Sequence, residues 1–146
     1  MKAEDSRVGA EYVSALDNVV RVFQSEQSIE SATKDDLSQG LRGLHAFLEQ
    51  LRFVKGGRAN LTEAFWQANN DDQARVKKTV TYLLHGPGDF IQRLHDILYD
   101  RDWKIGLFAF FCAFELFGSI KPQEFPPING RIAKGLRFIG FNVRGT

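Results

Sequence analysis

The sequence predicts an all-α fold, a single compact domain of six to seven helices over residues 1–146 with a central apolar helix. Apolar residues recur every three or four positions along nearly the whole chain, as on one face of a helix. Helix-capping residues and glycine or proline breaks separate these runs, and no long stretch alternates apolar with polar residues as a half-buried strand does. A chain of 146 residues, 43% of them hydrophobic, is long enough to bury a core without disulfides.

Two long helices are predicted in the first third of the chain, over residues 6–25 and 33–54. Thr33 lies three residues before Asp36, which resembles a capping box and marks the start of the second helix. The polar cluster 25–31 is expected to end the first helix, and the two helices to pack as an antiparallel pair. The apolar stripes are Val8, Tyr12, Leu16, Val19, Val20 and Phe23 in the first helix, and Leu37, Leu41, Leu44, Leu48 and Leu51 in the second.

Four shorter helices are predicted to follow. A helix over 61–69, capped by Asn60 or Thr62, is expected to end at Asn70-Asp71-Asp72, which caps the next helix. That helix should stop at Gly86-Pro87-Gly88, after which Asp89 caps a fifth. The run 105–117 is apolar all round, which predicts the central buried helix. The buried stripes are Val76, Val80, Leu83 and Leu84, then Phe90, Leu94 and Ile97.

The last thirty residues have a different character. Pro122, Pro126 and Pro127 favour an extended chain, because proline fixes φ and disfavours helix at the preceding residue. Asn129 is then expected to cap a final helix that ends at Gly140. Ile132, Leu136 and Ile139 form its buried stripe. The chain ends without a polar tail, and we interpret it as the N-terminal module of a longer protein, with a downstream domain or partner subunit.

Composition excludes several classes of protein. A single cysteine cannot form an intramolecular disulfide framework. One cysteine and three histidines are also too few ligands for a cysteine-rich zinc site. We expect no cofactor. No stretch reaches the ~18–20 apolar residues of a membrane span, and the N-terminus lacks the apolar core of a secretory signal. The sequence therefore predicts a cytoplasmic protein that does not bind membranes.

Charge is unevenly distributed although the net charge is only +1. Residues 1–73 contain 8 Lys/Arg and 12 Asp/Glu, whereas residues 74–146 contain 11 and 6. After Glu124 there are four cations and no acid. Such asymmetry indicates either contact with nucleic acid or attraction between the two halves of the fold. Trp103 and Phe125, near loops, are the aromatic residues best placed to stack on bases, whereas most of the other phenylalanines are expected in the core.

Few side chains suggest catalysis. Cys112 lies in the most apolar helix, where burial should raise the pKa of its thiol. Glu115 is the only acid within 107–117, so we expect it either to face the surface or to form an ion pair with Arg131 or Arg137. The histidines near Gly86-Pro87-Gly88, His85 and His95, match no metal-binding spacing with Asp89 and Asp96. An enzyme using Glu115 or the region of His85 and Asp89 is the least favoured hypothesis.

One segment resembles a known family. Residues 125–140, Phe-Pro-Pro-Ile-Asn-Gly-Arg-Ile-Ala-Lys-Gly-Leu-Arg-Phe-Ile-Gly, follow Phe114-Glu115-Leu116-Phe117 and Lys121-Pro122-Gln123-Glu124. This pattern is similar to the C-terminal element of helix-hairpin-helix DNA glycosylases, in which a proline-containing loop leads to a capped basic helix. A similar segment occurs in N-terminal regions of prokaryotic restriction and phage-defence ATPases. The resemblance covers about thirty of the 146 residues.

The departures from the family limit what the resemblance implies. Asn129 occupies the position of the catalytic aspartate, and an amide cannot act as a general base. A glycine-rich hairpin of the family type is also absent, and Leu84 to Gly88 is only a faint counterpart. The resemblance therefore implies a scaffold without base excision: a non-catalytic DNA-binding module of a prokaryotic restriction or antiviral defence system.

The candidate nucleic-acid site follows from that last helix. Free backbone N–H groups and the positive end of the dipole at its N-terminus suit a phosphate, and basic side chains three residues apart form a stripe. The predicted contacts are Lys121, Asn129, Arg131, Lys134 and Arg137, with DNA or RNA as the partner. The alternative is a protein-interaction or homo-oligomerisation domain without nucleic-acid binding, favoured by aromatic residues near loops and by the opposed charge of the two halves.

Overall fold

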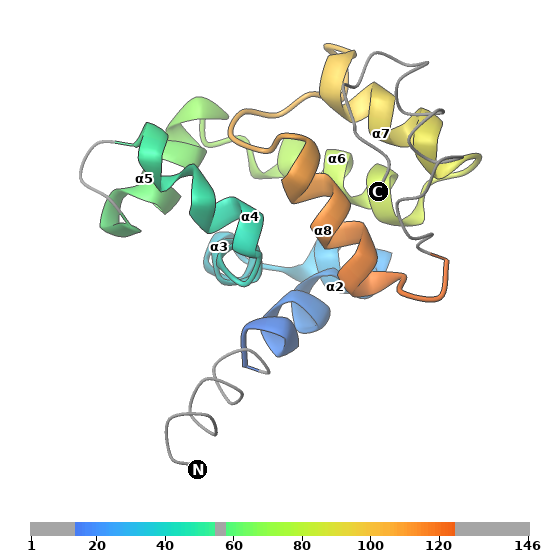
Figure 1. The fold of residues 1–146 in the computed structure, drawn as a ribbon, viewed down its shortest axis with the longest axis horizontal. Helices are drawn as coiled ribbons and strands as arrows, with labels where there is room; N and C mark the ends of the chain where they lie inside the picture. Colours follow the sequence, from blue (N-terminus) through green and yellow to red (C-terminus); the bar gives the residue numbers. More distant parts are fainter. Residues whose placement is uncertain (1–13, 55–57, 125–146) are drawn as a thin grey trace, which may run out of the picture.

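The computed structural model describes residues 14–54 and 58–124, and this part of the chain consists of helices and connecting loops, without strands (Figure 1). The all-α single-domain prediction is confirmed over these ranges. The helix predicted after Asn129 lies outside them. A helix covers residues 14–23. It is followed by α2 (Glu26–Ser31), α3 (Lys34–Arg42), α4 (His45–Leu48), the 3-10 helix η1 (Glu49–Phe53), α5 (Arg58–Ala68), α6 (Gln73–His85), α7 (Phe90–Tyr99) and α8 (Phe110–Ile120).

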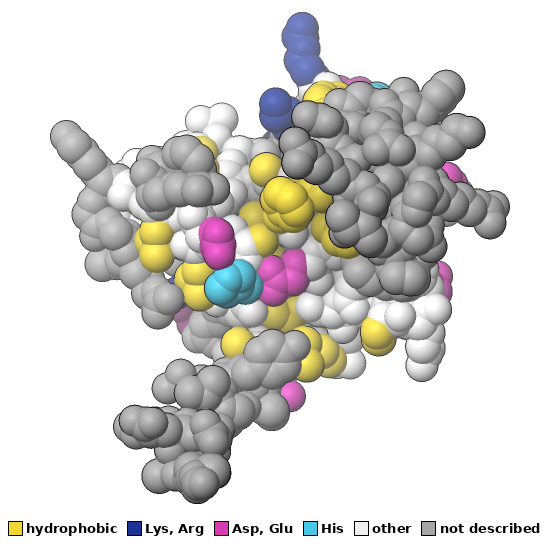
Figure 2. Space-filling model, in the orientation of Figure 1, with side chains coloured by type: hydrophobic (Ala, Val, Ile, Leu, Met, Phe, Trp, Pro, Cys, Tyr) yellow, Lys and Arg dark blue, Asp and Glu magenta, His cyan; other side chains and the backbone are white. Residues whose placement is uncertain are grey.

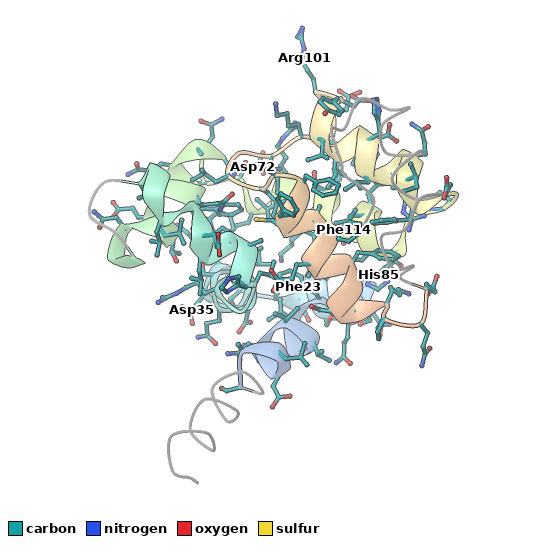
Figure 3. All side chains as sticks on the ribbon, in the orientation of Figure 1. Phe23, Asp35, Asp72, His85, Arg101 and Phe114 are labelled. Atoms are coloured by element: carbon teal, nitrogen blue, oxygen red, sulfur yellow. The ribbon has the colours of Figure 1, made fainter. Side chains whose placement is uncertain are left out.

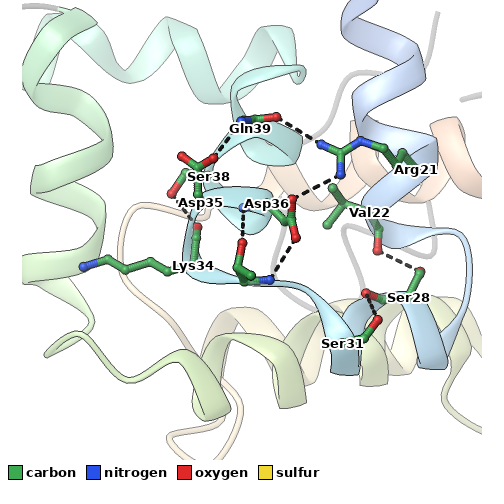
Figure 4. Close-up of polar contacts among 10 residues, drawn as sticks. Arg21, Val22, Ser28, Ser31, Lys34, Asp35, Asp36, Ser38 and Gln39 are labelled. Atoms are coloured by element: carbon green, nitrogen blue, oxygen red, sulfur yellow. Dashed lines mark hydrogen bonds and ion pairs between the residues drawn. The ribbon is translucent and has the colours of Figure 1, made fainter.

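Two capping boxes start the second and third helices, and Figure 4 shows the contacts of Asp36 in the second of them. The box at Thr33 and Asp36 confirms the prediction, and the backbone N–H of Thr33 lowers the pKa of the Asp36 carboxyl, helped by Arg21. The box formed by Ser25 and Ser28 was not predicted. This box begins a new helix. The polar cluster 25–31 therefore both ends the first helix and forms α2.

The predicted helix over 33–54 is wrong, because the chain turns after α3. Gly43 lies so close to the first helix that a Cβ on it would be 2.5 Å from the carbonyl oxygen of Ala15. Leu44 then adopts an extended conformation, with φ −90° and ψ 125°, before α4 begins. The leucine stripe nevertheless faces the interior on both sides of the turn, and Leu41 and Leu44 are fully buried.

The breaks on either side of α6 were predicted correctly. Asn70 and Asp71 both have φ of 56°, a left-handed conformation that asparagine and aspartate tolerate, and Asp72 caps α6. At the other end Gly86 is the C-cap. The buried Arg93 holds the following turn, because its guanidinium donates to the carbonyls of Leu83 and Gly88. Asp89 occupies the N-cap position of α7 but makes no side-chain capping bond.

Helix α8 begins five residues later than predicted and buries only one face. Residues 105–109 form a loop, in which Leu107 has a positive φ of 53°. The interior face of α8 carries Cys112, Ala113, Leu116 and Phe117, whereas Phe111 is 70% exposed. The structure therefore does not bury α8 on all sides as predicted, although one face of this helix packs into the core.

The core joins all of these elements. Phe23 is completely buried and packs against Gly40 of α3 (Figure 3). The indole N–H of Trp66 on α5 donates to the Ser38 hydroxyl of α3, so the buried ring has a polar partner. In the described part of the chain no helix is both long and apolar enough to cross a membrane.

Candidate functional site

The predicted nucleic-acid site lies mostly outside the described residues. Asn129, Arg131, Lys134 and Arg137 belong to the segment 125–146. Lys121 is described: it is the C-cap of α8, and its ammonium lies 3.8 Å from the Glu124 carboxylate. An ion pair at the surface contributes little free energy, so an anion such as phosphate can replace Glu124 as the partner of Lys121.

Glu115 is half-buried and makes two contacts that the sequence did not predict, while Arg131 and Arg137, its expected ion-pair partners, lie outside the described residues. Its two carboxylate oxygens accept hydrogen bonds from the backbone N–H groups of His45 and Ala46, at 2.8 and 2.7 Å. Leu44, the N-cap residue of α4, makes no side-chain cap, so a carboxylate from α8 performs that role from 70 residues away. The negative charge meets the positive end of a short helix, and the contact joins α4 to α8.

The histidine and aspartate residues near Gly86-Pro87-Gly88 do not gather into a metal site. The ring Nε2 of His85 lies 3.2 Å from the carbonyl oxygen of Phe23. Asp96 accepts from the Tyr82 hydroxyl and from Gln92, and His95 contacts the ring of Tyr99. Among the described residues no three histidine, cysteine, aspartate or glutamate side chains are grouped closely enough to hold a metal ion.

Cys112 behaves as a buried apolar residue. Burial raises the pKa of its thiol to about 12, and the thiol lies 3.7 Å from the side-chain oxygen of Gln50. A thiol in this protonated state is a poor nucleophile. The expected raised pKa is confirmed.

Trp103 is not the open stacking platform that the sequence suggested. Its ring stacks on Tyr82, with centroids 3.9 Å apart and an interplanar angle of 13°, and the ammonium of Lys78 lies 4.8 Å from its centre. Its carbonyl accepts a hydrogen bond from Thr79. These contacts, with those of the Arg75 guanidinium to the carbonyls of Arg101 and Lys104, hold the α7–α8 loop on α6.

A large apolar hollow in the described structure was not predicted. It measures about 1250 Å³ and lies between α4, the end of α7, the 104–109 loop and the outer face of α8. We call it the α4–α8 groove. Figure 2 shows hydrophobic side chains gathered in this region of the molecule. Its aromatic wall consists of Tyr99, Phe108, Phe110, Phe111 and Phe114.

Charged side chains lie on two walls of the α4–α8 groove. His45 of α4 and Glu49, the first residue of η1, form an exposed pair, with Nε2 2.8 Å from a carboxylate oxygen. On the loop, Lys104 is exposed, and within the described part of the chain its ammonium forms no ion pair. The sequence carries no specific signal for this groove, because the apolar run around Phe110 and Phe111 does not show which ring remains outside.

Comparison of the chain with protein-family models, with curated proteins and with solved structures finds no match. The resemblance of the C-terminal segment to the glycosylase fold thus remains a prediction.

Proposed function

We propose that this chain is a non-catalytic DNA-binding module that contacts the phosphate backbone through Arg131, Lys134 and Arg137. Asn129 begins the basic helix in this proposal, and Lys121 extends the contact surface. The observation that supports it is the position of Glu115. Because two backbone N–H groups at 2.7 and 2.8 Å already stabilise this carboxylate, it does not require Arg131 or Arg137 as its counter-ion.

The charge of the C-terminal segment supports the same function. Residues 125–146 contain four cations and no acid, so phosphates are favourable partners for them. Contacts of this kind position a protein on nucleic acid without reading the sequence. A small number of phosphate contacts predicts modest affinity that decreases with salt in proportion to the number of contacts. The resemblance to restriction and defence proteins makes such a system the proposed setting.

The chemistry of the candidate residues favours binding over catalysis. The Asn129 amide does not titrate and cannot take a proton from water, whereas it can cap a helix. Glu115 holds α4, and Cys112 is kept protonated by burial. Glu115 and Cys112, two of the groups that could have suggested an enzyme, therefore have structural roles.

Fluorescence anisotropy tests this proposal directly. The whole chain is titrated onto labelled single- and double-stranded DNA at low salt, together with the variants Arg131→Glu and Lys134→Glu. Arg42→Glu, on the exposed end of α3, is the matched control because it changes the charge by the same amount. We expect the two C-terminal variants to lose binding with an unchanged helical circular dichroism spectrum. Equal binding by all the variants would reject the proposal.

A second function, binding of a partner protein, is favoured by a different observation. Phe111 projects from α8 with 70% of its surface exposed, beside the α4–α8 groove. An exposed phenylalanine on an apolar hollow is typical of interaction surfaces.

A further inference from the structure

We propose that the α4–α8 groove binds an amphipathic helix of a partner protein, with an acidic residue of that helix next to Lys104. This inference rests on the second function, protein binding, and is independent of DNA binding. Four features of the described residues support it: the size of the groove, the exposure of Phe111, the rigidity of the walls and the charge of Lys104.

The size of the groove indicates a peptide. Small-molecule pockets measure about 300–1,000 Å³ and enclose most of their ligand. The α4–α8 groove, at about 1250 Å³, exceeds that range and is lined by α4, the end of α7, the 104–109 loop and α8. Helix-in-groove complexes use such surfaces, with apolar residues of the bound helix at positions i, i+3, i+4 and i+7.

Phe111 has the position of an anchor residue for such a helix. Its ring packs edge-on against Phe110, with centroids 5.0 Å apart at an interplanar angle of 81°. Covering an aromatic ring that is 70% exposed removes a large apolar area from water.

Two polar clamps hold the walls of the groove in place. Glu115 of α8 caps α4 through two hydrogen bonds. The buried Asn69 exchanges two hydrogen bonds with the backbone of Gly106, which fixes the loop that separates α7 from α8. A groove with fixed walls is already formed before a partner arrives, and binding does not have to order it.

Lys104 determines the charge that the partner needs. His45 and Glu49 already pair with each other at 2.8 Å, and Glu115 is used by α4. Lys104 is the groove-lining cation among the described residues, is exposed, and forms no ion pair there. A carboxylate on the partner helix complements it, and complementary charge at the edge of an interface selects the partner.

The experiment uses the whole chain and a display library of amphipathic helical peptides. The peptides carry randomised large apolar residues on one face and either glutamate or lysine at the flanking positions. Selection is carried out separately on the wild type and on Lys104→Glu. Arg101→Glu is the matched control: Arg101 is in the same loop, outside the groove lining, and points away from the molecule (Figure 3).

We expect glutamate-flanked peptides to be enriched on the wild type and on Arg101→Glu, and lysine-flanked peptides on Lys104→Glu. Phe111→Ala should weaken the selected peptides by about tenfold or more, as for an anchor residue. Loss of binding in Phe111→Ala without a switch in charge preference would overturn the acidic helix while leaving protein binding intact. No enrichment, or self-association of the wild type through Phe111 in sedimentation velocity, would overturn the partner helix altogether.

Discussion

Asn69 and Gly106 exchange two hydrogen bonds that join the end of α5 to the α7–α8 loop. The Asn69 side-chain nitrogen donates to the Gly106 carbonyl at 3.0 Å, and the Gly106 backbone N–H donates to the Asn69 side-chain oxygen at 2.7 Å. Asn69 is 5% exposed, and its nitrogen also donates to the carbonyl of Phe65. One side chain at the end of α5 thus satisfies the backbone of a loop 37 residues away and positions the start of α8.

Replacing Asn69 with alanine should destabilise the fold by about 1–3 kcal/mol, because it removes the partner of the half-buried N–H and carbonyl groups of Gly106. Urea unfolding followed by circular dichroism measures the change. Gln67→Ala is the matched control, since Gln67 is exposed and makes only a long 3.4 Å contact with Glu63. Equal stability of the two variants would mean that the Asn69 bonds do not hold the loop.

Glu115→Ala should destabilise the protein by about 2–4 kcal/mol, since each hydrogen bond to a charged group contributes about 1.5–3 kcal/mol. Glu115→Gln should cost about half as much, because its amide retains one acceptor oxygen. Chemical denaturation of both variants, with the exposed Glu124→Gln as control, provides the comparison. If Glu115→Gln is as stable as the wild type, the cap on α4 is unimportant.

Cys112 should make the protein less stable at alkaline pH. The thiol has a pKa of 9.0 in the unfolded chain and about 12 in the folded protein, so the folded state holds its proton more tightly. The resulting stabilisation is complete below pH 9 and is lost as the pH rises from 9 toward 12. Unfolding free energies of the wild type and Cys112→Ala, measured across that range, should converge as pH rises. A constant difference would contradict the raised pKa.

Gly43→Ala should destabilise the protein by about 1–3 kcal/mol through overpacking. The added Cβ meets the carbonyl oxygen of Ala15 at 2.5 Å, and backbone cannot move aside as a flexible side chain can. Thermal unfolding compares this variant with Gln24→Ala on the exposed surface. An unchanged midpoint in Gly43→Ala would show that α3 and the first helix are further apart than described.

The elements that the sequence predicts well are those fixed by local chemistry. The Thr33–Asp36 box, the Asp72 cap and the Gly86-Pro87-Gly88 stop all act within a few residues, so their signals are visible in the chain. The buried face of α6 likewise follows from spacing alone.

The features that the sequence does not reveal depend on contacts between distant residues. The end of α3 is set by the approach of Gly43 to Ala15, and the start of α4 by a carboxylate from α8. An apolar run such as 105–117 also cannot show which of its side chains remain outside. For this reason the exposure of Phe111, and with it the α4–α8 groove, could be found only in the folded structure.

The salt dependence of DNA binding is the most direct test of the central claim. For B-DNA the logarithm of the binding constant falls with the logarithm of salt concentration with a slope of about −0.9 for each phosphate contact. Lys121, Arg131, Lys134 and Arg137 together predict a slope of about −3 to −4 for the whole chain between about 50 and 200 mM salt.

Arg131→Gln, Lys134→Gln and Arg137→Gln should each reduce the magnitude of that slope by about 0.9. Arg42→Gln should leave it unchanged. A slope that stays the same in the triple variant, or no binding by the wild type at the lowest salt, would contradict the proposal that the C-terminal cations hold DNA.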